Sequence, residues 1–159
     1  MSQSTPAATP AATLAALRRL LLATWWFGLA GTGAELLLMG HVEDGWQLVP
    51  VILVALAGLA RVAMVVARST SGAAAAMWLF RGVMVMLMLS GVTGAVLHYR
   101  ANMEFKREMD PSLSGFKLFS TVVQAKAPPT LAPGTMTLLG VLGLASVFRL
   151  DVPTSSRNP

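Results

Sequence analysis

Four long runs of apolar residues, separated by short polar segments, follow one another along the chain. They extend over about 20–40, 48–67, 73–97 and 132–148. The first three have the roughly 20 residues that an α-helix needs to cross a bilayer core, and the fourth is short but sufficient. Backbone polar groups in lipid must be satisfied within the segment, which favours helices over loops or open sheets. We therefore expect an all-α integral membrane protein, a bundle of four transmembrane helices.

The loop between the third and fourth runs is the only long one, and its second half has helical periodicity. Asp110 and Pro111 end the preceding helix. Beyond Ser114, apolar residues recur on one side and polar residues on the other: Phe116, Phe119 and Val123 against Lys117, Thr121 and Gln124. We expect an amphipathic helix at about 112–125 that lies on the membrane surface or caps the bundle.

The two ends of the chain differ from this membrane domain, which we place at 14–150. Residues 1–13 are small and uncharged, so we expect a disordered tail, and residues 151–159 form a C-terminal tail. The arginine pair before the first apolar run also resembles the start of a signal peptide, with a weak cleavage sequence, "GTGA", at 31–34. Because apolar residues resume after Glu35, we expect a retained membrane helix.

The composition supports a membrane protein and removes several function classes. Hydrophobic residues make up 55% of the chain and charged residues 12%, whereas about a quarter of a soluble domain is charged. The chain has no cysteine, which excludes disulfides, thiolate metal sites and cysteine nucleophiles. Its net charge of +5 is spread along the sequence. This spread argues against nucleic-acid binding and favours contact with anionic lipid headgroups.

The distribution of basic residues predicts the orientation in the membrane. One set of helix ends carries Arg18, Arg19, Arg61, Arg68, Arg81, Arg149 and Arg157. The first loop at the opposite ends has no Lys or Arg, so the positive-inside rule places both termini in the cytoplasm of a bacterial cell. The long loop weighs against this orientation, because it contains Arg100, Lys106, Arg107, Lys117 and Lys126.

Two arginines lie inside predicted spans at a common depth. Arg61 and Arg81 are each about 10 Å from the predicted cytoplasmic ends of their helices. In one interpretation, they extend to phosphates of the inner leaflet, as Arg18, Arg19 and Arg68 do. In the other, they form a basic pocket for an anionic lipid head or substrate.

Glu35 is the only acid inside a predicted span. It lies roughly 7–8 Å below the outer end of the first helix, so its carboxyl group must be protonated, paired or turned to a wet cavity. If the first and third helices touch, Glu35 can meet His98 or Arg100. Small residues at 28, 32, 90 and 94 would allow that approach. The predicted outer-face polar cluster comprises Glu35, His41, Glu43, Asp44, His98, Arg100, Asn102 and Glu104.

Several roles are open to this outer-face polar cluster. It could lock the helices through ion pairs or hydrogen bonds. It could hold a divalent metal through Glu35, His41, His98 and Glu43, but these ligands lack a recognised spacing motif. A b-type haem between the two histidines would also need inward-facing helix positions and space for the ring. We predict no cofactor. A proton pathway lacks a relay at the membrane centre. We interpret Met77, Met84, Met86 and Met88 as packing or lipid contacts and not as copper ligands.

The segments "GHVEDGWQLVP", "HYRANMEF" and "PSLSG" resemble a group of small, uncharacterised bacterial membrane proteins with four helices. The resemblance covers most of residues 20–148 and implies the topology without an activity. No nucleophile elbow, phosphate loop or pair of catalytic carboxylates is present, so we expect no enzyme. The favoured function is an accessory or structural subunit that contacts lipids and other membrane proteins or itself. The alternative is a metal, haem or small-ligand binding protein, or a small transporter, that uses Glu35, His41 and His98.

Overall fold

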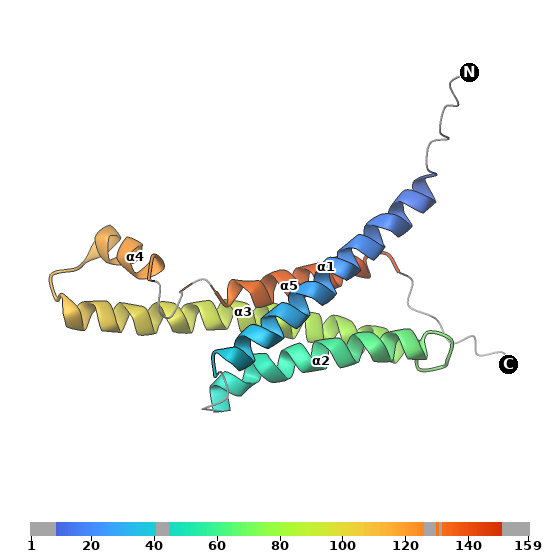
Figure 1. Ribbon diagram of the computed structural model, residues 1–159, viewed down its shortest axis with the longest axis horizontal. Coiled ribbons are helices and arrows are strands. Elements are labelled where there is room, and N and C mark those ends of the chain that lie inside the picture. Colours follow the sequence, from blue (N-terminus) through green and yellow to red (C-terminus); the bar gives the residue numbers. More distant parts are fainter. Residues whose placement is uncertain (1–8, 41–44, 126–129, 131, 151–159) are drawn as a thin grey trace, which may run out of the picture.

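The computed structural model describes residues 9–40, 45–125, 130 and 132–150, and its regular elements there are all α-helices (Figure 1). They are α1 (Pro10–Leu38), α2 (Gly45–Ala67), α3 (Ala73–Met109), α4 (Gly115–Val123) and α5 (Gly134–Ser146). The first three are long and apolar enough to cross a membrane. The all-helical prediction is therefore confirmed with three candidate spans. The fourth predicted span forms a helix of 13 residues, about 20 Å long and shorter than a bilayer core.

The start of α1 lies well before the predicted span. Pro10 occupies the first turn, where its missing N–H costs nothing, and the Thr9 side chain accepts a hydrogen bond from the Ala12 N–H at 3.3 Å. Residues 10–13, which we expected in a disordered tail, are therefore helical. At its other end α1 stops at Leu38, and Gly40 has a φ of 67°, a conformation that suits glycine.

The bounds of α2 and α3 also differ from the predicted spans. Because α2 begins at Gly45, Pro50 lies inside the helix and not in its first turn. There its ring nitrogen has no hydrogen to donate, so one helical hydrogen bond is lost. The 37 residues of α3 form a helix about 55 Å long, which exceeds the roughly 30 Å of a bilayer core. Its last turns are rich in charged helix-forming residues and contain no helix breaker before Asp110 and Pro111.

Four of the helices contact one another in a closed order. α1 contacts α2 and α5, and α3 contacts the same two helices from the other side. In Figure 1, α1 crosses the others obliquely, α3 extends beyond them, and α4 folds back along the end of α3. We call the end where α1 stops and α2 starts the Glu35 end, and the end where α2 stops and α3 starts the arginine end.

A tryptophan forms the centre of the hydrophobic core. Trp25 is fully buried, and its indole N–H donates a hydrogen bond to the Leu139 carbonyl oxygen of α5 at 3.0 Å. Its ring meets Phe80 of α3 edge-on, with ring centroids 5.8 Å apart, beside the buried Met84. One side chain thus joins α1, α3 and α5, and its polar atom is satisfied as a buried indole requires.

Glycines bring α5 close to α3 and α1. A Cβ atom at Gly140 would overlap the side chain of Met88 and the backbone oxygen of Met84, and one at Gly143 would overlap Met84. We expected Gly28 and Gly94 to bring the first and third helices together. Instead, they face Leu139 and Pro133, so small residues serve the packing of α5.

The short helix α4 packs on the protruding end of α3. Its buried residues are Leu118 and Val122. The expected apolar face is different, because Phe116 is 82% exposed and Phe119 is 49% exposed. A buried polar latch fixes the position of α4: the Asn102 amide donates to the Thr130 hydroxyl at 2.9 Å, which donates to the Val122 carbonyl oxygen at 2.7 Å.

Candidate functional site

A cavity of about 450 Å³ lies between the helices at the Glu35 end. All four contacting helices contribute to its wall. The lining residues are Thr32, Glu35, Leu36 and Met39 of α1; Trp46, Gln47, Val49, Pro50 and Leu53 of α2; Met86, Leu89, Ser90, Thr93, Gly94, Leu97 and His98 of α3; and Ala132, Pro133, Thr135 and Met136 in or just before α5. Most of this wall is apolar.

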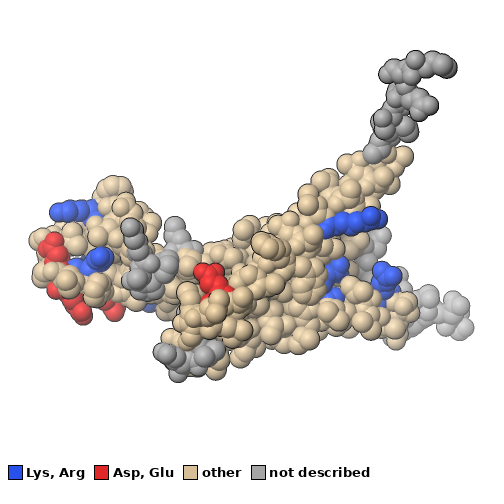
Figure 2. All heavy atoms as spheres, viewed as in Figure 1, with Lys and Arg blue, Asp and Glu red and all other residues tan. Residues whose placement is uncertain are grey.

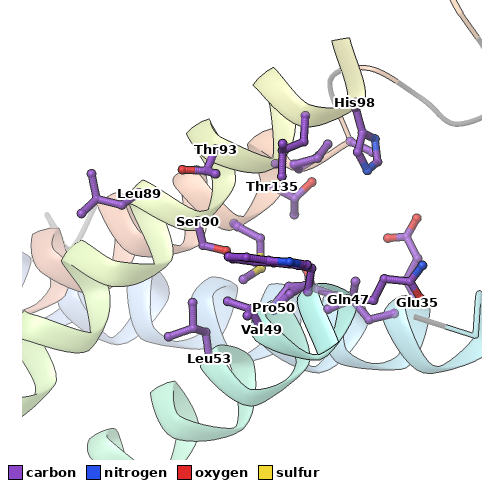
Figure 3. A pocket seen from close by; sticks show the side chains of 18 of the residues that line it. Glu35, Gln47, Val49, Pro50, Leu53, Leu89, Ser90, Thr93, His98 and Thr135 are labelled. Atoms are coloured by element: carbon purple, nitrogen blue, oxygen red, sulfur yellow. The ribbon is translucent and has the colours of Figure 1, made fainter. Parts of the chain in front are cut away.

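The ionisable side chains of the cavity lie together at one end. Figure 3 shows the side chains of Glu35 and His98 projecting from opposite sides toward the same end of the cavity, with Gln47 near Glu35. Leu53 and Leu89 lie toward the other end. The cavity is therefore amphipathic, with a polar end and an apolar body, which is the pattern of a small-molecule site.

Helical spacing explains why these residues meet. The lining residues of α1 are separated by three, one and three positions, which places them on one face of the helix. On α3 the same spacing runs without a break from Met86 to His98. His98 enters the cavity because α3 continues as a helix beyond residue 97. Pro50 adds to the wall from inside α2.

Glu35 lies in the last turn of α1, closer to the helix end than we expected, and its side chain is exposed. Across the described residues, its carboxyl group forms no hydrogen bond or ion pair. Its oxygens thus remain available at the polar end of the cavity. The helix-locking ion pair that we considered for Glu35 is not formed within the part of the chain that the structure describes.

The structure brings together only part of the predicted outer-face polar cluster. Glu35 and His98 share the cavity, whereas Arg100 and Glu104 are exposed and do not line it. Asn102 is buried in the latch that holds α4. The remaining members, His41, Glu43 and Asp44, lie outside the described residues.

Sequence reasoning did not assign Gln47, Thr93 and Thr135 to this site. Thr32 and Ser90 were noted only for their small size. A signal was present in α3, where polar Ser90, Thr93 and His98 fall on one face of an otherwise apolar helix. Gln47 and Thr135 could not be assigned this way, because each stands alone near the start of its helix.

The described residues supply few metal donors. Among residues 9–40, 45–125, 130 and 132–150, no three His, Asp or Glu side chains lie close enough to hold a metal ion. Glu35 and His98 are two donors, whereas structural metal sites usually need four and catalytic sites three. The predicted metal set also includes His41 and Glu43, which are not described.

The arginine end has a different chemistry. In the face that Figure 2 shows, the coloured charged side chains at this end are all basic, whereas both signs mix over α4 and the end of α3. Arg18 donates to the Phe148 carbonyl oxygen at 2.9 Å, and Arg81 donates to that of Leu150 at 3.3 Å. Two of the five arginines that we predicted to contact lipid phosphates thus hold the residues that follow α5. Arg19 is exposed, and Arg61 and Arg68 line a second cavity.

The first cavity can therefore enclose an apolar body of limited size and present acceptor and donor atoms to a polar head. Ser90, Thr93 and Thr135 add hydroxyl groups along the wall.

Comparisons with protein-family models, curated proteins and solved structures found no match to this chain.

Proposed function

We propose that this protein binds an amphipathic small molecule in the cavity at the Glu35 end and has no catalytic activity of its own. The observation that carries the proposal is the cavity itself. Its volume of about 450 Å³ falls within the roughly 300–1,000 Å³ of small-molecule sites. An apolar wall with a few polar groups at one end is what such a ligand requires.

The distribution of polar side chains indicates the chemistry of the ligand. Glu35 offers acceptor oxygens, which favours a head with a hydroxyl, amide or amine donor. The apolar wall favours a hydrocarbon or ring body. Since α1, α2 and α3 are long and apolar enough to cross a membrane, such a ligand can enter from the lipid phase.

We further propose the topology in which this site acts. The closed contacts of α1, α2, α3 and α5 support a four-helix bundle in a bacterial cytoplasmic membrane. The turns on both sides of α5 lengthen its short apolar segment toward a fourth crossing. The positive-inside rule then puts the arginine end and both termini in the cytoplasm, with the cavity and α4 toward the outer side.

The test is retention of a co-purifying small molecule. We would purify the full chain in mild detergent and count bound small molecules by native mass spectrometry. Thr93→Phe fills the cavity and should abolish retention. Val92→Phe, on an exposed position of the same helix turn, is the matched control and should retain the ligand. Equal retention in these two variants would contradict the proposal.

The polar end is tested separately. Replacing Glu35 with Gln and His98 with Gln together should weaken retention about tenfold, because hydrogen bonds to the head are lost. Glu104→Gln, an exposed change on α3 outside the cavity, should have no effect. An unchanged affinity in the double variant would assign binding to the apolar wall alone and overturn the proposed head chemistry.

A second candidate function is an accessory subunit of a membrane complex. It is favoured by exposed apolar side chains on the α3–α4 hairpin, among which Met109 is 72% exposed and Phe116 is 82% exposed. Exposed apolar side chains that gather into one patch mark contact sites for partners. Affinity purification of the full chain should then recover a stoichiometric partner that Phe116→Ser with Phe119→Ser releases. Recovery of a monomer alone would count against this function.

A further inference from the structure

A second cavity, of about 310 Å³, opens between α2 and α3 at the arginine end. Its wall includes Arg61 and Arg68 of α2, Ala73 at the start of α3, and Leu150 beyond α5. Arg61 and Arg68 are seven residues apart, so they lie on one face of α2, about 10 Å apart along its axis. Two long cationic side chains thus border one cavity.

The surroundings of Arg61 hold its guanidinium group in the helix interface. The residue is partly buried, and its Cζ atom lies over the ring of Phe80, 5.9 Å from the centroid. Its Nη1 contacts the Met64 sulfur at 3.8 Å, which is a weak acceptor. Within the described part of the chain, it has no oxygen acceptor for its other N–H groups.

The neighbouring arginines differ from Arg61 and Arg68 in their partners. Arg18 and Arg81 donate to backbone carbonyl oxygens of the segment that follows α5. Within the described residues, Arg68 forms no such hydrogen bond. The described carboxyl groups, at positions 35, 104, 108 and 110, belong to the Glu35 end and the hairpin beyond it. No described acid therefore neutralises the second cavity.

We propose that this second cavity binds the phosphate group of an anionic membrane lipid, with Arg61 and Arg68 as its ligands. Guanidinium groups form paired, charge-assisted hydrogen bonds with phosphate oxygens. The first residue of α3 borders the cavity, where the N-terminal partial charge of a helix also favours an anion. This site is separate from the ligand cavity at the Glu35 end.

The walls favour a lipid over a soluble phosphate. Met64, Met77 and Leu150 line the cavity with apolar atoms. On the same two helices, Val62 and Val66 of α2 and Leu79 of α3 are 51%, 71% and 56% exposed, so acyl chains can lie along the helices. α2 and α3 are also candidate membrane spans, which places the phosphate at headgroup level if the chains enter the hydrocarbon core.

The experiment measures lipid retention on the full chain in detergent. We would titrate the protein with phosphatidylglycerol, phosphatidylcholine or inorganic phosphate and count bound species by native mass spectrometry. We expect one phosphatidylglycerol per chain, and at least tenfold weaker binding in the Arg61→Gln, Arg68→Gln double variant. Arg19→Gln with Arg149→Gln removes the same charge from exposed positions at the same end, and should change the affinity less than twofold.

A conservative variant guards against loss of the fold. Arg61→Lys with Arg68→Lys keeps the charge and should bind more tightly than the glutamine variant but more weakly than the wild type, because lysine lacks the paired donors. Circular dichroism must show unchanged helix content in all three double variants. Equal lipid loss in the Arg19/Arg149 control would overturn the site, as would equal binding of phosphatidylcholine. Binding of inorganic phosphate without preference for the lipid would assign the cavity to a soluble anion and overturn the lipid proposal.

Discussion

The half of the helices near the arginine end and the half near Glu35 use the same four elements but pack them differently. In the first half, Trp25 fills the space between α1, α3 and α5, and Gly143 lets Met84 approach α5. In the second, a cavity of about 450 Å³ remains between the four helices. The half near the arginine end is therefore closely packed, whereas the half near Glu35 retains open space between its helices.

The largest effect on stability should come from disrupting the close glycine contact between α5 and α3. Gly140→Ala places a Cβ atom against the backbone of Met84 and should lower the free energy of unfolding by about 2 kcal/mol. Gly82→Ala in α3 is the control, because its added Cβ atom meets nothing within 4 Å. It should be neutral or up to about 1 kcal/mol stabilising. Denaturation in mixed micelles, followed by circular dichroism, measures both, and equal stability would contradict the packing difference.

The core tryptophan gives the next effect. Trp25→Phe removes the hydrogen bond to the Leu139 carbonyl oxygen and part of a buried ring, which should cost about 1–2 kcal/mol of unfolding free energy. Trp26→Phe changes a residue that is 41% exposed and should cost under about 0.5 kcal/mol. The same denaturation assay compares them. A similar cost for both would show that Trp25 does not hold the core.

The latch of α4 should behave as a local unit, independent of both halves. Asn102→Ala removes the amide that donates to Thr130 and should cost about 1–2 kcal/mol locally. Hydrogen exchange should rise in α4 while the helices around Trp25 keep their protection. Faster exchange throughout the chain would instead make α4 part of the main folding unit.

Filling the open half should cost little stability. Thr93→Phe adds a ring to a wall of the cavity and should change the unfolding free energy by less than about 1 kcal/mol. The same change should abolish the proposed ligand binding. The comparison with Gly140→Ala is direct, because both changes add side-chain volume beside α3. An equally large destabilisation by Thr93→Phe would show that the Glu35 end is closed.

The smallest effect is a pH dependence in the turn after α3. Hydrogen bonds from the Ser112 side chain and backbone N–H lower the pKa of Asp110 below its ordinary value of 3.8. Because the pKa of Asp110 is lower in the folded protein, its ionised carboxylate stabilises the turn fully at pH values above 3.8. This contribution is lost as the pH falls through the pKa of the folded state. Exchange of the Ser112 amide should therefore speed up relative to neighbouring amides only below about pH 4. Asp110→Asn should remove this pH dependence.

The spans could be predicted because they depend on local apolar content. The start of α1 could also have been read from Thr9 and Pro10, a capping pair that the apolar run does not include. By contrast, the buried face of α4 depends on which helix it meets. Phe116 and Phe119 are apolar by type but exposed, whereas Leu118 and Val122 are the buried residues of α4.

The candidate site was predicted in part for a similar reason. Glu35 and His98 stood out because polar residues are rare in apolar helices, and both reach the cavity. Asn102 shares the spacing of His98 but binds Thr130, a partner that no helical periodicity indicates. Gly28 and Gly94, which we assigned to contacts between the first and third helices, face Leu139 and Pro133 instead. Such pairings are a property of the tertiary arrangement and not of the local sequence.

The unbroken length of α3 has a mechanical consequence for a membrane protein. Its apolar part, residues 73–97, is about 37 Å long, which is longer than an average bilayer core. Such hydrophobic mismatch is relieved by tilting the helix or by local thickening of the bilayer. Because α4 packs on the part of α3 that extends beyond the other helices, we expect a thinner membrane that increases the tilt of α3 to bring α4 closer to the lipid surface. Membrane thickness would then set how far this end of the protein stands from the bilayer.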